Sequence, residues 1–150
     1  MTKNRRKLLN SEKVDEILKL VDEIAHTSNS GTLIVVEGKK DEDVLRRIGV
    51  RGEILKLSEY GRNKSVNLLE KYEFRDLLIL TDFDEEGEKM AQKLEKIAFN
   101  CGFKVNKSLR LKIRKVFIEY SKTIEGLRNI LDESLKRRIK MNYFRNLSGG

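Results

Sequence analysis

The sequence has no proline, a single cysteine, Cys101, and a single histidine, His26. One cysteine cannot form an internal disulfide, and together with one histidine it cannot provide the ligands of a Cys/His zinc cluster. The sequence also lacks a run of about 18 apolar residues and the charged, apolar and small-residue pattern of a secretory signal. We therefore expect a cytoplasmic protein without a membrane-spanning segment.

Charged residues are abundant, and positive charge dominates among them. The chain has 32 Lys and Arg against 24 Asp and Glu, which gives a net charge of +8. This excess favours a polyanionic partner such as nucleic acid, although a solvated basic surface also explains it. One basic cluster is Arg110, Lys112, Arg114 and Lys115, and a cluster of this kind is more often a solvated face than a binding site.

The hydrophobic pattern predicts alternating strands and helices. A continuous apolar, β-branched run indicates a strand at 32–36, and further strands are predicted at 53–57 and 76–80, with a short fourth strand at 103–105. Helical spacing of apolar residues indicates helices at about 14–25, 41–48, 63 onward, 84–98, 107–120 and 125–144. Successive β-α units predict an α/β fold, a three-layer sandwich around a short parallel four-stranded sheet, with helices added at both ends.

Residues 107–120 fit two patterns. Leu109, Leu111 and Ile113 alternate with basic residues, as in a strand. The apolar residues at 109, 113, 116, 117 and 120 instead keep helical spacing over three turns. Because the helical pattern is the longer one, we predict a helix.

Carboxylates directly follow two of the predicted strands. Glu37 ends the strand at 32–36, and Asp82-Phe83-Asp84 follows the strand at 76–80, with Gly87 three residues later. In doubly wound sheets ligands gather at the carboxyl ends of strands. If the strand order is 2-1-3-4, the first and third strands lie about 4.8 Å apart, so Glu37 and Asp82 can reach one ion. Three carboxylates so close would repel one another unless a divalent cation neutralised them.

Each of these residues also has a structural explanation when taken alone. Asp84 can be a helix cap and Gly87 a tolerated helix glycine. A calcium-binding EF-hand is a poor explanation, because it needs a glutamate at loop position twelve, where this chain has Lys93. A haloacid-dehalogenase-like phosphatase is also weak, because its D-x-D pair normally follows the first strand. The joint occurrence of the acidic motifs at two strand ends favours a functional site.

Together these motifs resemble the Toprim domain, the catalytic fold of bacterial-type primases, type IA and type II topoisomerases and certain nucleases. The resemblance rests on the strand ending in Glu37-Gly38, the strand ending in Asp82-Phe83-Asp84 with Gly87, and the β-α spacing between them. It implies a Toprim domain at 31–105, an N-terminal helical extension at 1–30 and a C-terminal helical extension at 106–150 packed on the same domain. The full chain is similar to small archaeal Toprim proteins, which have a segment like that at 122–127.

The resemblance implies Mg²⁺-dependent phosphodiester chemistry on nucleic acid, RNA or DNA, of a nuclease or RNA-processing type. It makes Glu37 a general acid or base or a metal ligand, and Asp82 and Asp84 ligands of Mg²⁺, for which Mn²⁺ can substitute. Topoisomerase and primase activities are not expected, because both need additional domains. The alternative is a non-catalytic module that binds nucleic acid, a ribosome or a replication partner.

Further residues are candidates for contacts with phosphate or nucleic acid. Gly38 permits close approach of a ligand to the backbone, and Lys39 can pair with a phosphate as a point charge. An aromatic side chain with nearby cations suits single-stranded nucleic acid, and such a group follows the second strand as Tyr60, Arg62 and Lys64. Glu125 lies in the family-like Ile124-Glu125-Gly126 segment, although a glutamate at the start of a helix explains it equally well.

Overall fold

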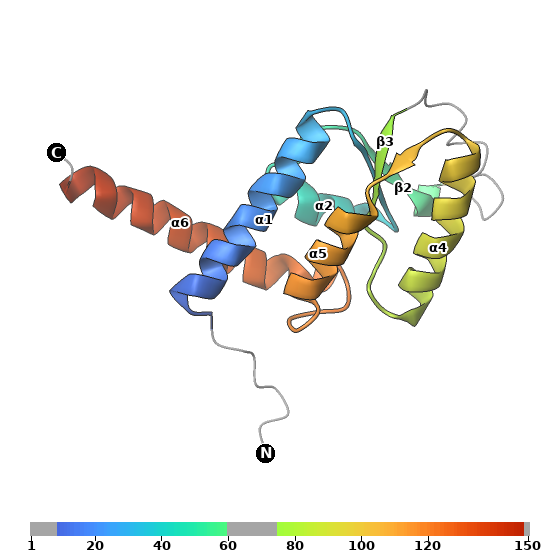
Figure 1. The fold of residues 1–150 in the computed structure, drawn as a ribbon. Coiled ribbons are helices and arrows are strands. Elements are labelled where there is room, and N and C mark those ends of the chain that lie inside the picture. Colours follow the sequence, from blue (N-terminus) through green and yellow to red (C-terminus); the bar gives the residue numbers. More distant parts are fainter. Residues whose placement is uncertain (1–8, 60–74, 149–150) are drawn as a thin grey trace, which may run out of the picture.

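The computed structural model describes residues 9–59 and 75–148. In these ranges four strands form one parallel sheet: β1 (Leu33–Val36), β2 (Ile54–Lys56), β3 (Asp76–Ile79) and β4 (Lys104–Val105). Their order is β2-β1-β3-β4 (Figure 1). In the central strand, Ile34 is paired with Ile54 on one side and with Leu78 on the other. The predicted α/β fold is confirmed.

Five α-helices and two short 3₁₀ turns surround this sheet in the described ranges. They are α1 (Ser11–Asn29), α2 (Lys39–Arg47), η1 (Leu57–Glu59), α4 (Glu85–Asn100), α5 (Lys107–Phe117), η2 (Glu125–Leu127) and α6 (Arg128–Ser148). Several begin at side-chain caps: Asn10 accepts the Lys13 N–H at 2.8 Å, and Asn106 accepts the Leu109 N–H at 3.0 Å. The helix expected from residue 63 lies outside the described residues.

Most differences from the sequence-based boundaries are at element ends. The helix predicted at 107–120 is α5, which ends at Phe117. The last helix starts at Arg128 rather than near Glu125, because residues 125–127 form the tighter turn η2. The second strand is shorter than predicted, since its last position, Leu57, already belongs to the 3₁₀ turn η1.

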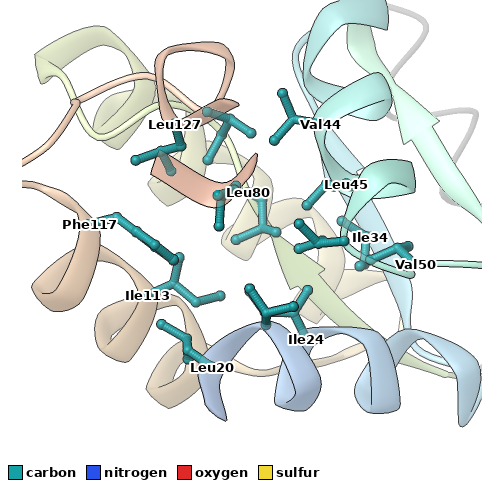
Figure 2. Packing of buried hydrophobic residues seen from close by; sticks show 14 of the residues in the cluster. Leu20, Ile24, Ile34, Val44, Leu45, Val50, Leu80, Ile113, Phe117 and Leu127 are labelled. Atoms are coloured by element: carbon teal, nitrogen blue, oxygen red, sulfur yellow. The ribbon is translucent and has the colours of Figure 1, made fainter. Parts of the chain in front are cut away.

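Different helices cover the two faces of the sheet, as the alternation of strand side chains requires. Ile34 and Val36 belong to a core formed with α1, α2, α5 and the start of α6. Leu33 and Val35 belong to a second core formed with α4. Figure 2 shows residues of the larger core, where side chains of α1, α2 and α5 meet β1 and the end of β3. Truncating one of these buried aliphatic side chains to alanine costs roughly 2–5 kcal/mol of stability.

Helix α6 packs on the body over its first half only. Leu131 is buried, and Arg138 forms an ion pair with Asp22 of α1 at 2.9 Å. From Ile139 to Leu147 the side chains are exposed, and this half of the helix projects away from the body (Figure 1). In the parts of the chain that the structure describes, no helix is long and apolar enough to cross a membrane.

Candidate functional site

The carboxyl ends of β1 and β3 bring Glu37 and Asp82 together. The two strands are adjacent in the sheet, and each acidic residue follows its strand closely. Glu37 Oε2 accepts a hydrogen bond from the backbone N–H of Asp82 at 2.7 Å. Both side chains are half-buried. The neighbouring strand order that the sequence suggested therefore places these two carboxylates in contact range.

The surroundings of Glu37 favour its protonated form. Burial raises the pKa of the Glu37 carboxyl above its ordinary value, and the negative charges of Asp82 and Asp41 raise it further. The hydrogen bond from the Asp82 N–H acts in the opposite direction but does not cancel these effects. A carboxyl whose pKa is raised toward neutrality is suited to proton transfer.

Asp41 is an acidic residue of the site that the sequence did not single out. It lies in the first turn of α2, is 8% exposed, and accepts the Gly38 N–H through Oδ2 at 3.1 Å. Burial raises the pKa of the Asp41 carboxyl, and the charges of Asp82 and Glu125 add to this. Its spacing of three residues from Gly38 is that of a helix-capping acid, and this was the one signal in the sequence that could have identified it.

A turn from far along the chain closes the site. The N–H of Ile124 donates to Asp82 Oδ1 at 2.9 Å, and the N–H of Phe83 donates to the carbonyl of Lys122 at 2.6 Å. The Thr123 hydroxyl stabilises this turn by accepting the Gly126 N–H at 3.0 Å. The segment that supported the family resemblance therefore contacts the Asp82 carboxylate directly.

Glu125, the further candidate, lies at the edge of the same cavity. We use the name acidic pocket for this cavity of about 420 Å³, whose acidic lining residues are Glu37, Asp41, Asp82 and Glu125. The Glu125 side chain is exposed and lies 3.6 Å from the ammonium of Lys40. Four carboxylates thus share a small space that is also lined by two lysines, Lys39 and Lys40.

Asp84, the third predicted carboxylate, lies outside the acidic pocket. Its Oδ1 accepts the Gly87 N–H at 2.7 Å and caps α4, and its side chain does not line the acidic pocket. Within residues 9–59 and 75–148, no three acidic, histidine or cysteine side chains converge on a common metal position. The structure therefore brings Glu37 and Asp82 together and leaves Asp84 at the start of the adjacent helix.

Gly87 is required by close packing. A Cβ atom at this position would overlap the carbonyl oxygen of Asp82. The Thr81 hydroxyl also donates to the Gly87 carbonyl at 2.8 Å, so the first turn of α4 lies tightly against the backbone of the site. By contrast, a Cβ at Gly38 would meet only the Ser58 hydroxyl, at an ordinary 3.6 Å. The fold therefore needs a glycine at position 87, whereas packing does not demand one at position 38.

Arg110 is buried and hydrogen-bonds to the backbone at the end of β3, so it is not part of a solvated basic face. It is 5% exposed, and its guanidinium donates to the carbonyls of Ile79, Thr81 and Asp82 at 3.0, 2.9 and 3.2 Å. It also donates to Glu88 at 2.8 Å. The expectation of a solvated face is wrong for Arg110, because carbonyls at the end of a strand need donors and this guanidinium supplies them.

Two of the five predicted phosphate contacts lie in the described part of the chain. Gly38 and Lys39 line the acidic pocket. The Lys39 ammonium is paired with Glu42 at 3.1 Å and with Asp43 at 3.3 Å, so much of its charge is already compensated. Three further predicted contacts lie outside the described residues: Tyr60, Arg62 and Lys64.

The donor set of the acidic pocket suits a hard divalent cation. Mg²⁺ prefers oxygen ligands and is usually held by one or two carboxylates, with water and substrate phosphate completing its shell. Glu37 and Asp82 supply such a pair. Burial is the main cause that raises the pKa of Glu37 and Asp41, and nearby negative charges add to it; a bound cation would offset both effects by stabilising the ionised carboxylates. The residues present therefore fit Mg²⁺ through Glu37 and Asp82.

Known proteins share both the sequence pattern and the fold. The Toprim domain family matches residues 32–120 of this chain. A UPF0292 protein from Pyrococcus furiosus is 36% identical over 129 residues, covering 86% of this chain and 91% of that protein. A UPF0292 protein from Methanosarcina barkeri is 30% identical over 135 residues, covering 88% and 90%. A solved structure of a protein from Aquifex aeolicus is similar with a TM-score of 0.59 and 29% identity, covering 71% of this chain and 94% of that one.

Proposed function

This chain belongs to the Toprim domain family, together with the archaeal UPF0292 proteins, and we propose on that basis that it is a Mg²⁺-dependent nuclease or RNA-processing enzyme. The family suggests a metal-dependent role connected with nucleic acid, and the cleavage of phosphodiester bonds is our own step beyond it. The observation that carries the proposal is the pairing of Glu37 with Asp82. Two half-buried acids from adjacent strands meet in a pocket where carboxylates outnumber lysines.

In this proposal Asp82 is the principal metal ligand and Glu37 either shares the ion or exchanges a proton with a substrate oxygen. The raised pKa of Glu37 supports the proton-transfer role. Asp84 is retained as a ligand candidate through the carboxylate oxygen that does not cap α4. When bound, Mg²⁺ (or Mn²⁺) would stabilise negative charge that develops on the phosphate during transfer.

The surrounding chain holds Asp82 in place before any substrate arrives. Arg110 fixes the backbone at the end of β3 from one side, and the N–H of Ile124 fixes the carboxylate through Oδ1. Gly87 allows the first turn of α4 to pack against the Asp82 carbonyl. A ligand held by several independent contacts loses little freedom on binding a metal ion, and such preorganisation favours electrostatic catalysis.

The experiment that tests the proposal is a cleavage assay on labelled RNA and DNA with Mg²⁺ or Mn²⁺. We expect Asp82→Ala and Glu37→Ala to reduce the rate by roughly 100-fold or more, the usual effect of removing a group that stabilises developing charge. Asp76→Ala is the matched control, because Asp76 is an exposed carboxylate at the opposite end of β3. This control should cleave at the wild-type rate.

The same assay separates the enzyme from a non-catalytic module. The alternative is favoured by one observation, that no three metal-binding side chains converge in the described residues. If no substrate is cut with either metal, while nucleic acid still binds to wild type and to both alanine variants, the nuclease proposal is wrong. The chain would then be a binding module that keeps the Toprim fold without its chemistry.

A further inference from the structure

A second cavity adjoins the acidic pocket. It encloses about 700 Å³ between α2 and the junction of η2 with α6. Lys40 and Glu125 line this cavity and also line the acidic pocket. The two cavities are therefore neighbours, with the Lys40–Glu125 pair at their common border.

Positive charge dominates the second cavity, which we name the cationic groove. Its charged lining residues are four cations, Lys40, Arg46, Arg47 and Arg128, and two acids, Asp43 and Glu125. The sign is opposite to that of the acidic pocket, where four carboxylates face two lysines. A ligand that spans both would experience attraction in the groove and repulsion in the pocket unless a metal ion occupied the latter.

Two of the groove's cations are used to hold the fold. Arg46 donates to the carbonyls of Val50 and Gly52 at 3.1 and 2.8 Å. Arg47 binds both carboxylate oxygens of Asp132, at 3.2 and 3.0 Å. These interactions join α2 to the following loop and to α6, so they form the wall of the groove.

The other two cations are available to a ligand. Arg128 is exposed at the start of α6, and no ion pair involves it in the described parts of the chain. The Lys40 ammonium lies 3.6 Å from Glu125, and both side chains are more than half exposed. An ion pair so exposed contributes little to stability, so an incoming anion can replace it at small cost.

We propose that the cationic groove binds the sugar-phosphate backbone of a nucleic-acid strand and leads it into the acidic pocket. This inference rests on the proposed function and adds the path of the substrate. Carboxylates of the pocket repel phosphates, so a strand reaches them only from a side where cations offset that repulsion. The cationic groove borders the pocket at Lys40 and Glu125 and provides such a side.

The groove uses a different lysine of α2 from the one that the sequence singled out. Lys39, the predicted phosphate contact, is paired with two carboxylates, Glu42 and Asp43. Lys40, its neighbour, points toward η2 and lines both cavities. Arg128 presents a planar fork of donors that matches phosphate oxygens. Contacts of this kind position a strand without reading its sequence.

The test measures binding of the full-length protein to a fluorescein-labelled single-stranded RNA and to a DNA of the same sequence, by anisotropy, in EDTA. EDTA removes divalent metal, so binding is measured separately from cleavage. The double variant Lys40→Ala/Arg128→Ala should bind at least about tenfold more weakly. The slope of log affinity against log salt should fall by about 1.4, as expected for two lost phosphate contacts on a single strand.

The matched control is Lys19→Ala/Lys96→Ala, which removes two exposed lysines from α1 and α4. It lowers the net charge by the same amount and should change affinity by less than about twofold, if the effect is local. Circular dichroism establishes that both double variants are folded. Equal weakening in the two double variants would show that only net charge matters and would overturn the inference.

Two further outcomes separate this inference from the proposed function. If the two double variants bind alike while Asp82→Ala abolishes cleavage, the groove is wrong and the nuclease stands. If only the groove variant loses binding while no substrate is cut with Mg²⁺ or Mn²⁺, the groove stands and the nuclease is wrong. Absence of any binding by the wild-type protein to RNA or DNA overturns both.

Discussion

The acidic pocket and an ion-pair cluster at the start of α2 contain adjacent residues of the chain. Asp41 belongs to the pocket, and Glu42 belongs to the cluster, which we define as Glu42, Lys39, Arg46 and Lys56. Both residues have the same small exposed fraction, 8%. Burial raises the pKa of Asp41, whereas hydrogen bonds from Lys56 and Lys39 lower the pKa of Glu42 to about 2.

The difference lies in how each region neutralises its charge. Glu42 contacts Lys56 at 3.0 Å, Lys39 at 3.1 Å and Arg46 at 3.3 Å, so its charge is compensated within the protein. Asp41 instead faces further acids across the pocket. A buried carboxylate that is paired with cations of the same protein has a structural role. Buried carboxylates that repel one another instead favour the binding of a cation from solution. This contrast separates the candidate site from the scaffold.

The largest expected effect comes from removing the charge of the cluster. Glu42→Ala should lower the free energy of unfolding by about 2–3 kcal/mol, because Lys56 and Arg46 lose a buried partner. Asp43→Ala, in the same helix, removes an exposed ion pair with Lys39 and should cost less than about 1 kcal/mol. Urea unfolding measures both, and equal losses would show that Glu42 is not the centre of a structural cluster.

The pH dependence of that effect has a defined sign. Because the pKa of Glu42 is lower in the folded protein than its ordinary value of 4.5, its contribution is present above pH 4.5. The contribution is lost as the pH falls from 4.5 toward 2. The stability difference between wild type and Glu42→Gln should therefore shrink over this interval.

The second effect tests the pocket with its expected ion. Mg²⁺ at about 100 times its dissociation constant should stabilise the folded protein by about 2.7 kcal/mol, since it binds the folded state alone. Asp82→Asn should abolish this stabilisation, and Asp76→Asn and Glu42→Gln should preserve it. Thermal unfolding with and without Mg²⁺ is the measurement. Undiminished stabilisation of Asp82→Asn would place the ion elsewhere.

A smaller effect concerns Glu37 in the absence of metal. Its pKa is raised by burial and by neighbouring acids, so its ionisation costs stability once the pH exceeds its ordinary value of 4.5. Glu37→Gln keeps an oxygen to accept the Asp82 N–H and removes the charge. The variant should be more stable than wild type at pH 7, by less than about 1 kcal/mol. The difference should vanish in acid, and a loss of stability at pH 7 would contradict the repulsion argument.

The smallest effect is a change in one titration. Asp41→Asn removes one of the charges that raise the pKa of Glu37, so that pKa should move down toward its ordinary value. Carbon-detected NMR of the glutamate carboxyls follows this titration directly. Asp43→Asn, which changes an exposed carboxylate of the same helix, should leave the titration of Glu37 unaltered. An upward movement in Asp41→Asn would show that the two carboxyls do not repel each other.

Local patterns in the sequence were sufficient for the sheet and for the first pair of acids. The runs at 32–36 and 76–80 predicted two buried strands, and the structure shows the adjacency that the prediction had assumed for them, so their carboxyl ends lie at one edge. The position of Asp84 as a helix cap was also one of the explanations that its sequence context offered. These features depend on neighbours within a few residues or on the order of the strands.

The remaining parts of the site depend on tertiary packing that no local pattern specifies. The contact between Ile124 and Asp82 joins residues 42 positions apart. Arg110 is surrounded by other basic residues in the sequence, which predicts exposure, yet its place on α5 puts it beneath the end of β3. The convergence of Asp41 and Glu125 on the cavity that Glu37 and Asp82 line likewise depends on tertiary packing.

Gly87 has a consequence for anyone who would transplant this acidic pocket onto another parallel sheet. Copying the carboxylates alone would fail, because a Cβ atom at the equivalent helix position would overlap the carbonyl of Asp82, and the helix could not pack against the strand end as it does here. A transplanted site therefore needs the carboxylates together with a glycine at the position equivalent to Gly87. A search for similar sites in other proteins should require this glycine as strictly as it requires the acidic residues.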